Sequence, residues 1–183
     1  MNTSTTRPST VRTMQAIVQD SYGDDAEDVL GLAQIDRPEI GVDEVLLRVH
    51  AAGLDKGVWR LMTGLPYVLR VMGVYGLGSP RTWVPGMDVA GRVEAVGKNV
   101  TRLRPGDEVY GVAAGSFAEF ARARADKLAP APANLTAVQA AAVPISALTA
   151  LQGLRAGGQV RPGQKVLVIG ASGGVGTFAV QIA

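Results

Sequence analysis

The chain has 183 residues, of which 47% are hydrophobic and 19% charged, enough apolar material for one complete domain and a remainder. Lys and Arg number 18 against 16 Asp and Glu, and no basic run or aromatic-interleaved patch occurs, so we expect no nucleic-acid partner. Cysteine is absent, which excludes disulfides and favours a cytoplasmic location, and no apolar run reaches the roughly 18 residues of a membrane-spanning helix, so we expect no membrane partner.

The opening stretch, MNTSTTRPSTVRT, contains Arg7 and Arg12, many hydroxyl side chains and no acidic residue. This composition is similar to that of a transit peptide. No apolar face accompanies the two arginines, however, so we interpret residues 1–13 as a disordered tail ahead of the first strand.

Between residues 14 and 128 the sequence consists of short alternating runs separated by Gly and Pro. In DEVLLRVHAAG, the side chains of Val45, Leu47 and Val49 fall on one face. Similar runs are MQAIVQD, DVLGLAQID, DVAGRVEAVG, PGDEVYGV and SFAEFARARADKLAP. Alternation with a period of two and frequent turns predict a mostly β, barrel-like antiparallel domain. In this interpretation Asp88 and Gly91, within GMDVAG, belong to structural turns.

Two parts of the chain depart from strand alternation. The stretch from Asp55 to Pro80 predicts a short helix followed by an irregular, apolar loop. After residue 133 the sequence becomes rich in Ala and Leu, and Asn134 or Thr136 can cap a helix. Pro144 divides this run into two helices, because proline lacks the N–H that an interior helical residue donates.

The last part of the chain combines an apolar run with a glycine-rich turn. KVLVIG, residues 165–170, is typical of a strand buried on both faces of a parallel sheet, and GVGTFAVQIA begins a helix. In the connecting GASGGVG, such a strand-to-helix turn lets backbone N–H groups approach a pyrophosphate at the positive end of the helix dipole. The alternative is a Gly-rich turn in another kind of α/β protein. The candidate cofactor-binding residues of this turn are Gly170, Ala171, Ser172, Gly173, Gly174, Val175 and Gly176.

The nucleotide-binding unit is predicted to be incomplete. From residue 165 onward the chain is shorter than the roughly 30 residues of a βαβ unit. The acid that usually holds a ribose hydroxyl, about 20 residues after the glycines, would fall past Ala183, so the sequence does not distinguish NAD from NADP. We expect this segment to be poorly stable unless a partner completes it.

Five stretches in this order resemble the medium-chain dehydrogenase/reductase superfamily: VLLRVHAAGLDKGVW, VPGMDVAGRVEAVGKNVTRLRPGDEVYG, GSFAEF, AAAVPISALTALQGL and VLVIGASGGVGTFAVQIA. The sequence is most similar to the N-terminal portion of the zinc-independent quinone oxidoreductase (zeta-crystallin-like) branch. The resemblance implies a mostly β GroES-like catalytic domain over residues 14–133, without its C-terminal elements. Residues 134–183 would form a helical linker and the truncated start of an α/β Rossmann domain, with the active site between the two domains.

The resemblance also predicts that no zinc is bound. Zinc-dependent members of the superfamily place a cysteine after AAG and a histidine after PG, where this chain has Asp55 and Met87. A catalytic zinc site needs three protein ligands, usually Cys, His or carboxylate, and the chain has no cysteine and a single histidine, His50. The four-cysteine structural lobe is also missing. We interpret His50 as a residue on the surface of a strand.

The activity implied by the resemblance is hydride transfer from NADPH or NADH, with NADP favoured, to a quinone or an α,β-unsaturated carbonyl. The candidate catalytic or pocket residues are Asp55, Trp59 and Tyr67. Asp55 stands where the family usually has an asparagine, and it can instead cap a helix. The two aromatic side chains can instead belong to ordinary packing. Ser146 and Thr149 are candidates for contact with the cofactor, although each hydroxyl can instead bond to its own helix backbone.

Three further hypotheses follow from the sequence. The chain by itself is expected to be inactive, and a second chain, in a homodimer, would complete the Rossmann domain. A non-enzymatic GroES-like module that binds a partner or associates with itself is the competing class. Within the enzyme class, an enoyl reductase is the alternative to a quinone reductase.

Overall fold

The computed structural model describes residues 12–73, 75–81 and 83–183. Its first element is an antiparallel pair formed by β1 (Thr13–Gln19) and β2 (Leu30–Asp36). The strand begins at Thr13, one residue inside the predicted tail, and residues 1–11 of that tail lie outside the described residues.

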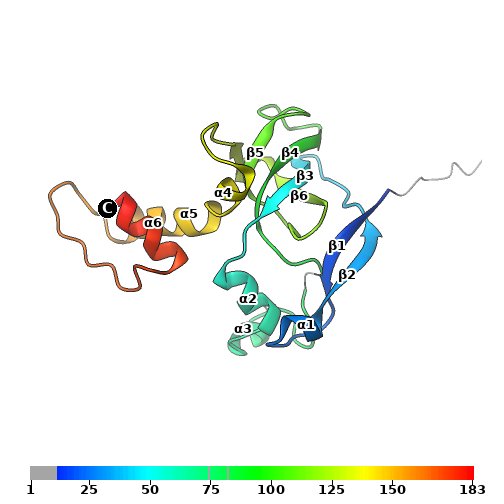
Figure 1. Cartoon of the computed structure of the whole chain (residues 1–183), viewed down its shortest axis with the longest axis horizontal. Coiled ribbons are helices and arrows are strands. Elements are labelled where there is room, and N and C mark those ends of the chain that lie inside the picture. Colours follow the sequence, from blue (N-terminus) through cyan, green and yellow to red (C-terminus); the bar gives the residue numbers. More distant parts are fainter. Residues whose placement is uncertain (1–11, 74, 82) are drawn as a thin grey trace, which may run out of the picture.

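A second sheet contains five strands in the order β6-β3-β4-β5-β7, and every neighbouring pair is antiparallel. Its strands are β3 (Glu44–Ala52), β4 (Asp88–Val96), β5 (Glu108–Val112), β6 (Phe120–Arg124) and β7 (Leu128–Pro130). An isolated bridge between Ala16 and Ala118 joins β1 to this region. Figure 1 shows the β1-β2 pair beside the strands of the larger sheet. The antiparallel β domain is therefore confirmed. Its described strands form two sheets rather than one closed ladder, since β6 and β7 are opposite edges.

The main hydrophobic core is built from the strands of the five-stranded sheet. Alternation in β3 buries Val45 and Leu47 completely, as the sequence pattern predicts. Full burial of one such side chain stabilises a fold by about 1.5–3 kcal/mol. The cluster consists of Val45, Leu47, Val89, Val93, Leu103, Val109, Ala113, Ala121, Ala123 and Leu128.

Three short helices lie beside the strands in the first half of the chain: α1 (Ala26–Val29), α2 (Lys56–Thr63) and α3 (Val68–Val71). The helix predicted after Asp55 is thus present as α2, and it ends at Gly64, whose φ of 63° lies in the left-handed region. Arg70 of α3 joins this helix to the C-terminal end of α2, donating to the carbonyl oxygens of Gly64 at 2.8 Å and Thr63 at 2.7 Å.

The proline-divided helical run is also confirmed. Thr136 and Gln139 form a capping box at the start of α4 (Ala137–Ala141), and Pro144 is the first residue of α5 (Pro144–Gln152). A π-helical turn over Gly153–Gly157 follows α5, and the last helix is α6 (Gly174–Ile182). Ala140 and Ala141 of α4 pack against the sheet at Ala90. Helices α5 and α6 contact each other and project away from the sheets (Figure 1).

The prediction of a strand at residues 165–170 is wrong for this structure, because these residues form no β ladder. Leu167 and Ile169 are 86% and 90% exposed, whereas the predicted strand would bury both faces. A buried parallel strand needs neighbouring strands to accept its hydrogen bonds, and the described residues supply none beside this segment. Within the described part of the chain, no helix is long and apolar enough to cross a membrane.

Candidate active site

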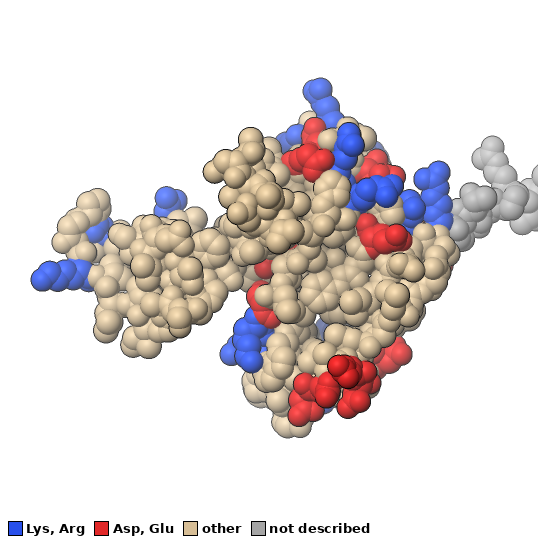
Figure 2. Space-filling view, viewed as in Figure 1, with Lys and Arg blue, Asp and Glu red and all other residues tan. Residues whose placement is uncertain are grey.

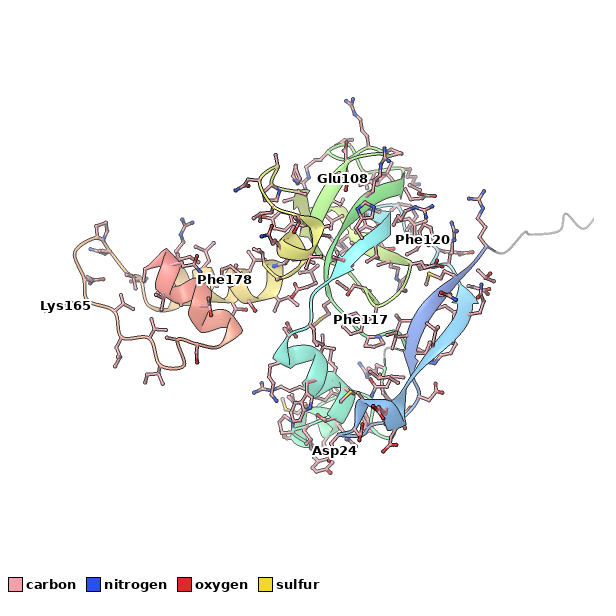
Figure 3. The ribbon with its side chains drawn as sticks, in the orientation of Figure 1. Asp24, Glu108, Phe117, Phe120, Lys165 and Phe178 are labelled. Carbon is pink, nitrogen blue, oxygen red and sulfur yellow. The ribbon has the colours of Figure 1, made fainter. Side chains whose placement is uncertain are left out.

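A cavity of about 1210 Å³ lies where the end of β3, α2 and the start of β4 meet the N-terminal turns of α5 and α6. Its lining is mainly apolar and includes the aromatic rings of Trp59, Phe117 and Phe178. Figure 3 labels the last two, one in the loop before β6 and one on α6. A mainly apolar cavity with a few polar groups is the usual form of a small-molecule site.

Asp55 combines the two roles that the sequence left open. It is the N-cap of α2, where its Oδ1 accepts a hydrogen bond from the N–H of Val58 at 2.9 Å, and it also lines the cavity. The cap fixes the orientation of the carboxylate, so a negative charge has a defined position at the cavity wall.

The two aromatic candidates of the 55–80 stretch occupy different places. Trp59 lines the cavity, and the Nζ atom of Lys56 lies over its ring at 3.3 Å from the centroid, a cation–π contact. Tyr67 is 68% exposed, lies near the guanidinium of Arg70, and is not among the residues that line the cavity. The structure therefore brings Trp59 and Asp55 together but does not bring Tyr67 to them.

Asp88 is one of the cavity residues that the sequence interpretation missed, as are Lys56, Phe117 and Phe178. Asp88 lies in β4 rather than in a turn, is 3% exposed, and lines the cavity. Burial raises the pKa of Asp88 to about 6; the hydrogen bond from the N–H of Ile145 opposes this shift, and the charge of Asp55 adds to it. An acidic residue within the apolar run DVAGRV was the available signal, since a strand buried on both faces rarely contains one. Gly91 likewise lies within β4.

The two hydroxyl candidates of α5 also differ in position. Ser146 is 9% exposed and lines the cavity, and its Oγ lies 3.0 Å from the place where a Cβ on Gly174 would be. The hydroxyl of Thr149 instead donates to the carbonyl oxygen of Ile145 at 2.6 Å, within its own helix. Ser146 therefore faces the glycine-rich turn at the cavity, and Thr149 does not line that cavity.

The turn at residues 170–176 has the local geometry that an anion needs. Gly170 has a φ of 76°, and a Cβ on Gly176 would lie 2.1 Å from the carbonyl oxygen of Gly170, so only glycine allows the helix to approach the turn this closely. The N-cap of α6 is Gly173, which has no side chain to accept the N–H groups of the first turn. Gly174 and Val175 line the cavity. The residues present therefore fit a dinucleotide phosphate at this helix N-terminus.

The positions that would hold zinc in zinc-dependent relatives carry other side chains. Asp55 and Met87 line the cavity, while His50 lies in β3 and faces Glu108, with 3.4 Å between its Nδ1 and a carboxylate oxygen. Among the described residues, no group of three or more His, Cys, Asp or Glu side chains is placed to hold a metal ion. The absence of zinc remains a prediction from the sequence.

Residues 41–133 match the alcohol dehydrogenase GroES-like domain family, and the chain belongs to this family. It is 35% identical over 181 residues to the chloroplastic quinone-oxidoreductase homolog of Spinacia oleracea, covering 93% of this chain and 52% of that protein. It is also 35% identical over 181 residues to the 2-methylene-furan-3-one reductase of Solanum lycopersicum, covering 93% of this chain and 44% of that protein.

Solved structures show the same relationship. The quinone oxidoreductase from Coxiella burnetii superposes with a TM-score of 0.80 at 31% identity, covering 93% of this chain and 53% of that one. Mycobacterial Rv1454c complexed with NADPH superposes with a TM-score of 0.75 at 32% identity, covering 92% of this chain and 48% of that one. The resemblance to medium-chain quinone oxidoreductases is thus confirmed, and the chain spans about half the length of the relatives it matches.

Proposed function

We propose that this chain provides the substrate side of an NADPH- or NADH-dependent, zinc-independent oxidoreductase that reduces quinones or α,β-unsaturated carbonyls. The observation that carries this proposal is the apolar cavity of about 1210 Å³, whose walls include both the GroES-like region and the first turn of α6. A substrate in this cavity would lie next to the turn that fits the cofactor's phosphates. The names of the relatives, which include quinone oxidoreductases and a furanone reductase, support the substrate class.

The reduced nicotinamide of NAD(P)H supplies two electrons as a hydride, and the residues of this chain provide binding, orientation and electrostatics. Trp59, Phe117 and Phe178 exclude water and offer flat apolar surfaces to a quinone ring. The carboxylate of Asp55 opposes the negative charge that develops on the substrate oxygen, whereas the ammonium of Lys56 favours it. NADP is favoured over NAD by the family resemblance, and a mycobacterial relative complexed with NADPH supports this choice.

Titration of the purified chain with NADPH and with NADH, read by quenching of its two tryptophans and by nicotinamide emission, tests the proposal. Saturable binding, tighter for NADPH, is expected, whereas the chain by itself is expected not to reduce quinones or enones. The test variant is Gly176→Val, whose side chain fills the close approach between α6 and the turn. The matched control is Gly157→Ala, whose Cβ meets nothing within 4 Å. A folded chain that binds neither nucleotide would contradict the proposal.

A homodimer, in which a second chain covers the exposed apolar residues of the 165–170 segment, is the partner arrangement that we propose. Val166, Leu167 and Ile169 are the observation that favours it, because exposed apolar side chains that follow one another along the chain mark a surface that a partner covers. Sedimentation across a range of concentrations tests it, and a monomer at every concentration would contradict it. A cytoplasmic location and an enoyl reductase activity stay predictions from the sequence.

A further inference from the structure

Asp88 is a buried carboxylic acid whose two oxygens have different surroundings. Its Oδ1 accepts a hydrogen bond from the N–H of Ile145 at 2.9 Å. This N–H is the first that α5 can donate, because Pro144, the first residue of the helix, has no N–H. The N-cap residue, Val143, has no side-chain acceptor for it, so Asp88 takes the place of a helix cap. One oxygen of Asp88 is therefore fixed by the start of a helix, in a position that stabilises a negative charge.

The other oxygen, Oδ2, is open because Gly53 has no side chain. A Cβ on Gly53 would lie 3.3 Å from Oδ2 and 2.7 Å from the Cβ of Asp88, and both residues line the cavity. Within the described part of the chain, no hydrogen bond to Oδ2 is formed. The carboxyl group thus has one oxygen anchored to the backbone and one free to meet a ligand in the cavity.

The charged and titratable groups around Asp88 are few. Asp55 and Lys56 face the same cavity from the start of α2. Of the two strands that pair with β4, β5 carries Glu108 and Tyr110, and β3 carries Glu44, Arg48 and His50. Helices α4, α5 and α6 contain no charged residue. Burial and the neighbouring Asp55 carboxylate raise the pKa of Asp88 to about 6, so about half of the group is protonated near pH 6 and about a tenth at pH 7.

We propose that Asp88 is the proton donor of this cavity, with Oδ2 carrying the proton that the oxygen of a reduced quinone or enone takes up. This inference rests on the proposed function for the identity of the substrate. When two electrons arrive as a hydride from NAD(P)H, the substrate oxygen becomes an oxyanion. The O–H bond at Oδ2 breaks, an O–H bond forms on the substrate, and the carboxylate that remains is stabilised by the N–H of Ile145. Solvent then returns one proton to Asp88.

Binding of an oxyanion to the chain tests this assignment without the cofactor. The probe is 2,4-dinitrophenol, which is ionised between about pH 5.5 and pH 7.5, and its affinity is measured through tryptophan quenching. A protonated Asp88 donates a hydrogen bond to the phenolate, whereas an ionised Asp88 repels it. We expect wild-type affinity to fall roughly tenfold over this range, and affinity in Asp88→Asn to stay constant, because the amide keeps the acceptor for Ile145 but does not titrate.

Asp107→Asn is the matched control, since Asp107 also accepts a backbone N–H, that of Arg104 at 2.8 Å, but does not line the cavity. It should keep the wild-type pH dependence. A wild-type pH dependence in Asp88→Asn would overturn the assignment. If that variant does not fold, infrared spectra of the wild-type chain decide: a protonated carboxyl band at about pH 5.5 is expected, and a fully ionised spectrum would overturn the proposal. Dinitrophenol binding requires no NADPH. A negative nucleotide titration would therefore contradict the proposed function without contradicting the role of Asp88.

Discussion

The GroES-like region and the segment after residue 133 differ in how their apolar residues are used. In the sheets, Val45, Leu47, Val89 and Val109 are fully buried, and charged side chains of both signs spread over the outside (Figure 2). The segment 134–183 has only basic charges, at Arg155, Arg161 and Lys165, and Gly176 is the one buried residue of α6. The apolar residues of the sheets form a core because neighbouring strands cover them. The apolar residues of segment 165–170 stay exposed because no neighbouring strand is present among the described residues.

Leucine truncation in the two regions should give the largest difference. Leu47→Ala removes a completely buried side chain from the main core, so we expect a loss of about 3–5 kcal/mol in the free energy of unfolding. Leu167→Ala, at a side chain that is 86% exposed, should change stability by less than about 0.5 kcal/mol. Urea denaturation of both variants measures this. Equal losses would mean that the 165–170 segment is buried in solution.

Gly53→Ala should have the next largest effect, at the junction between the two regions. The new Cβ would lie 2.4 Å from the carbonyl oxygen of Ala141 in α4, which must then move away from the sheet. We expect destabilisation of about 2–3 kcal/mol. Gly31→Ala in β2, whose Cβ meets nothing within 4 Å, is the control and should be nearly neutral. Thermal unfolding followed by circular dichroism compares the two, and an unaffected melting temperature in Gly53→Ala would show that α4 does not dock this closely.

The charge of Asp88 should make the stability of the fold depend on pH. Its pKa is raised from 3.8 to about 6 in the folded chain, so folding favours the protonated form and this contribution to stability is lost as the pH rises through about 6. Between about pH 4 and pH 7 the loss amounts to about 2 kcal/mol. Asp88→Asn should not show it. Denaturation of both proteins at a series of pH values measures the difference, and parallel curves would contradict the raised pKa.

The capping box of α4 should give the smallest effect. The hydroxyl of Thr136 accepts the N–H of Gln139, whose side chain accepts the N–H of Thr136, so Thr136→Ala leaves the N–H of Gln139 without its partner. We expect a loss of about 1 kcal/mol. Thr101→Ala, at an exposed loop position, is the control and should be neutral. Because α4 packs against the sheet, hydrogen exchange in α4 should rise in the first variant, and unchanged exchange would show that packing alone holds the helix.

Much of the fold and part of the candidate site follow from the sequence. The alternation in β3 predicts that Val45 and Leu47 are buried, Pro144 predicts the division between α4 and α5, and the glycine spacing predicts the turn before α6. These features are local, because they depend on the period of a strand, a missing N–H or a backbone conformation that only glycine adopts easily. A family resemblance added the likeness to quinone oxidoreductases, which the matched relatives confirm.

Tertiary structure alone decided the rest. Asp88 becomes a cavity residue only because the start of α5, 57 positions later in the chain, docks against β4, and Ser146 reaches the glycine turn only because α6 packs on α5. Trp59 and Tyr67 belong to the same apolar stretch of the sequence, yet only Trp59, on α2, lines the cavity. The segment 165–170 has the composition of a buried strand but forms none, because a strand requires hydrogen-bonding neighbours that a sequence pattern does not supply.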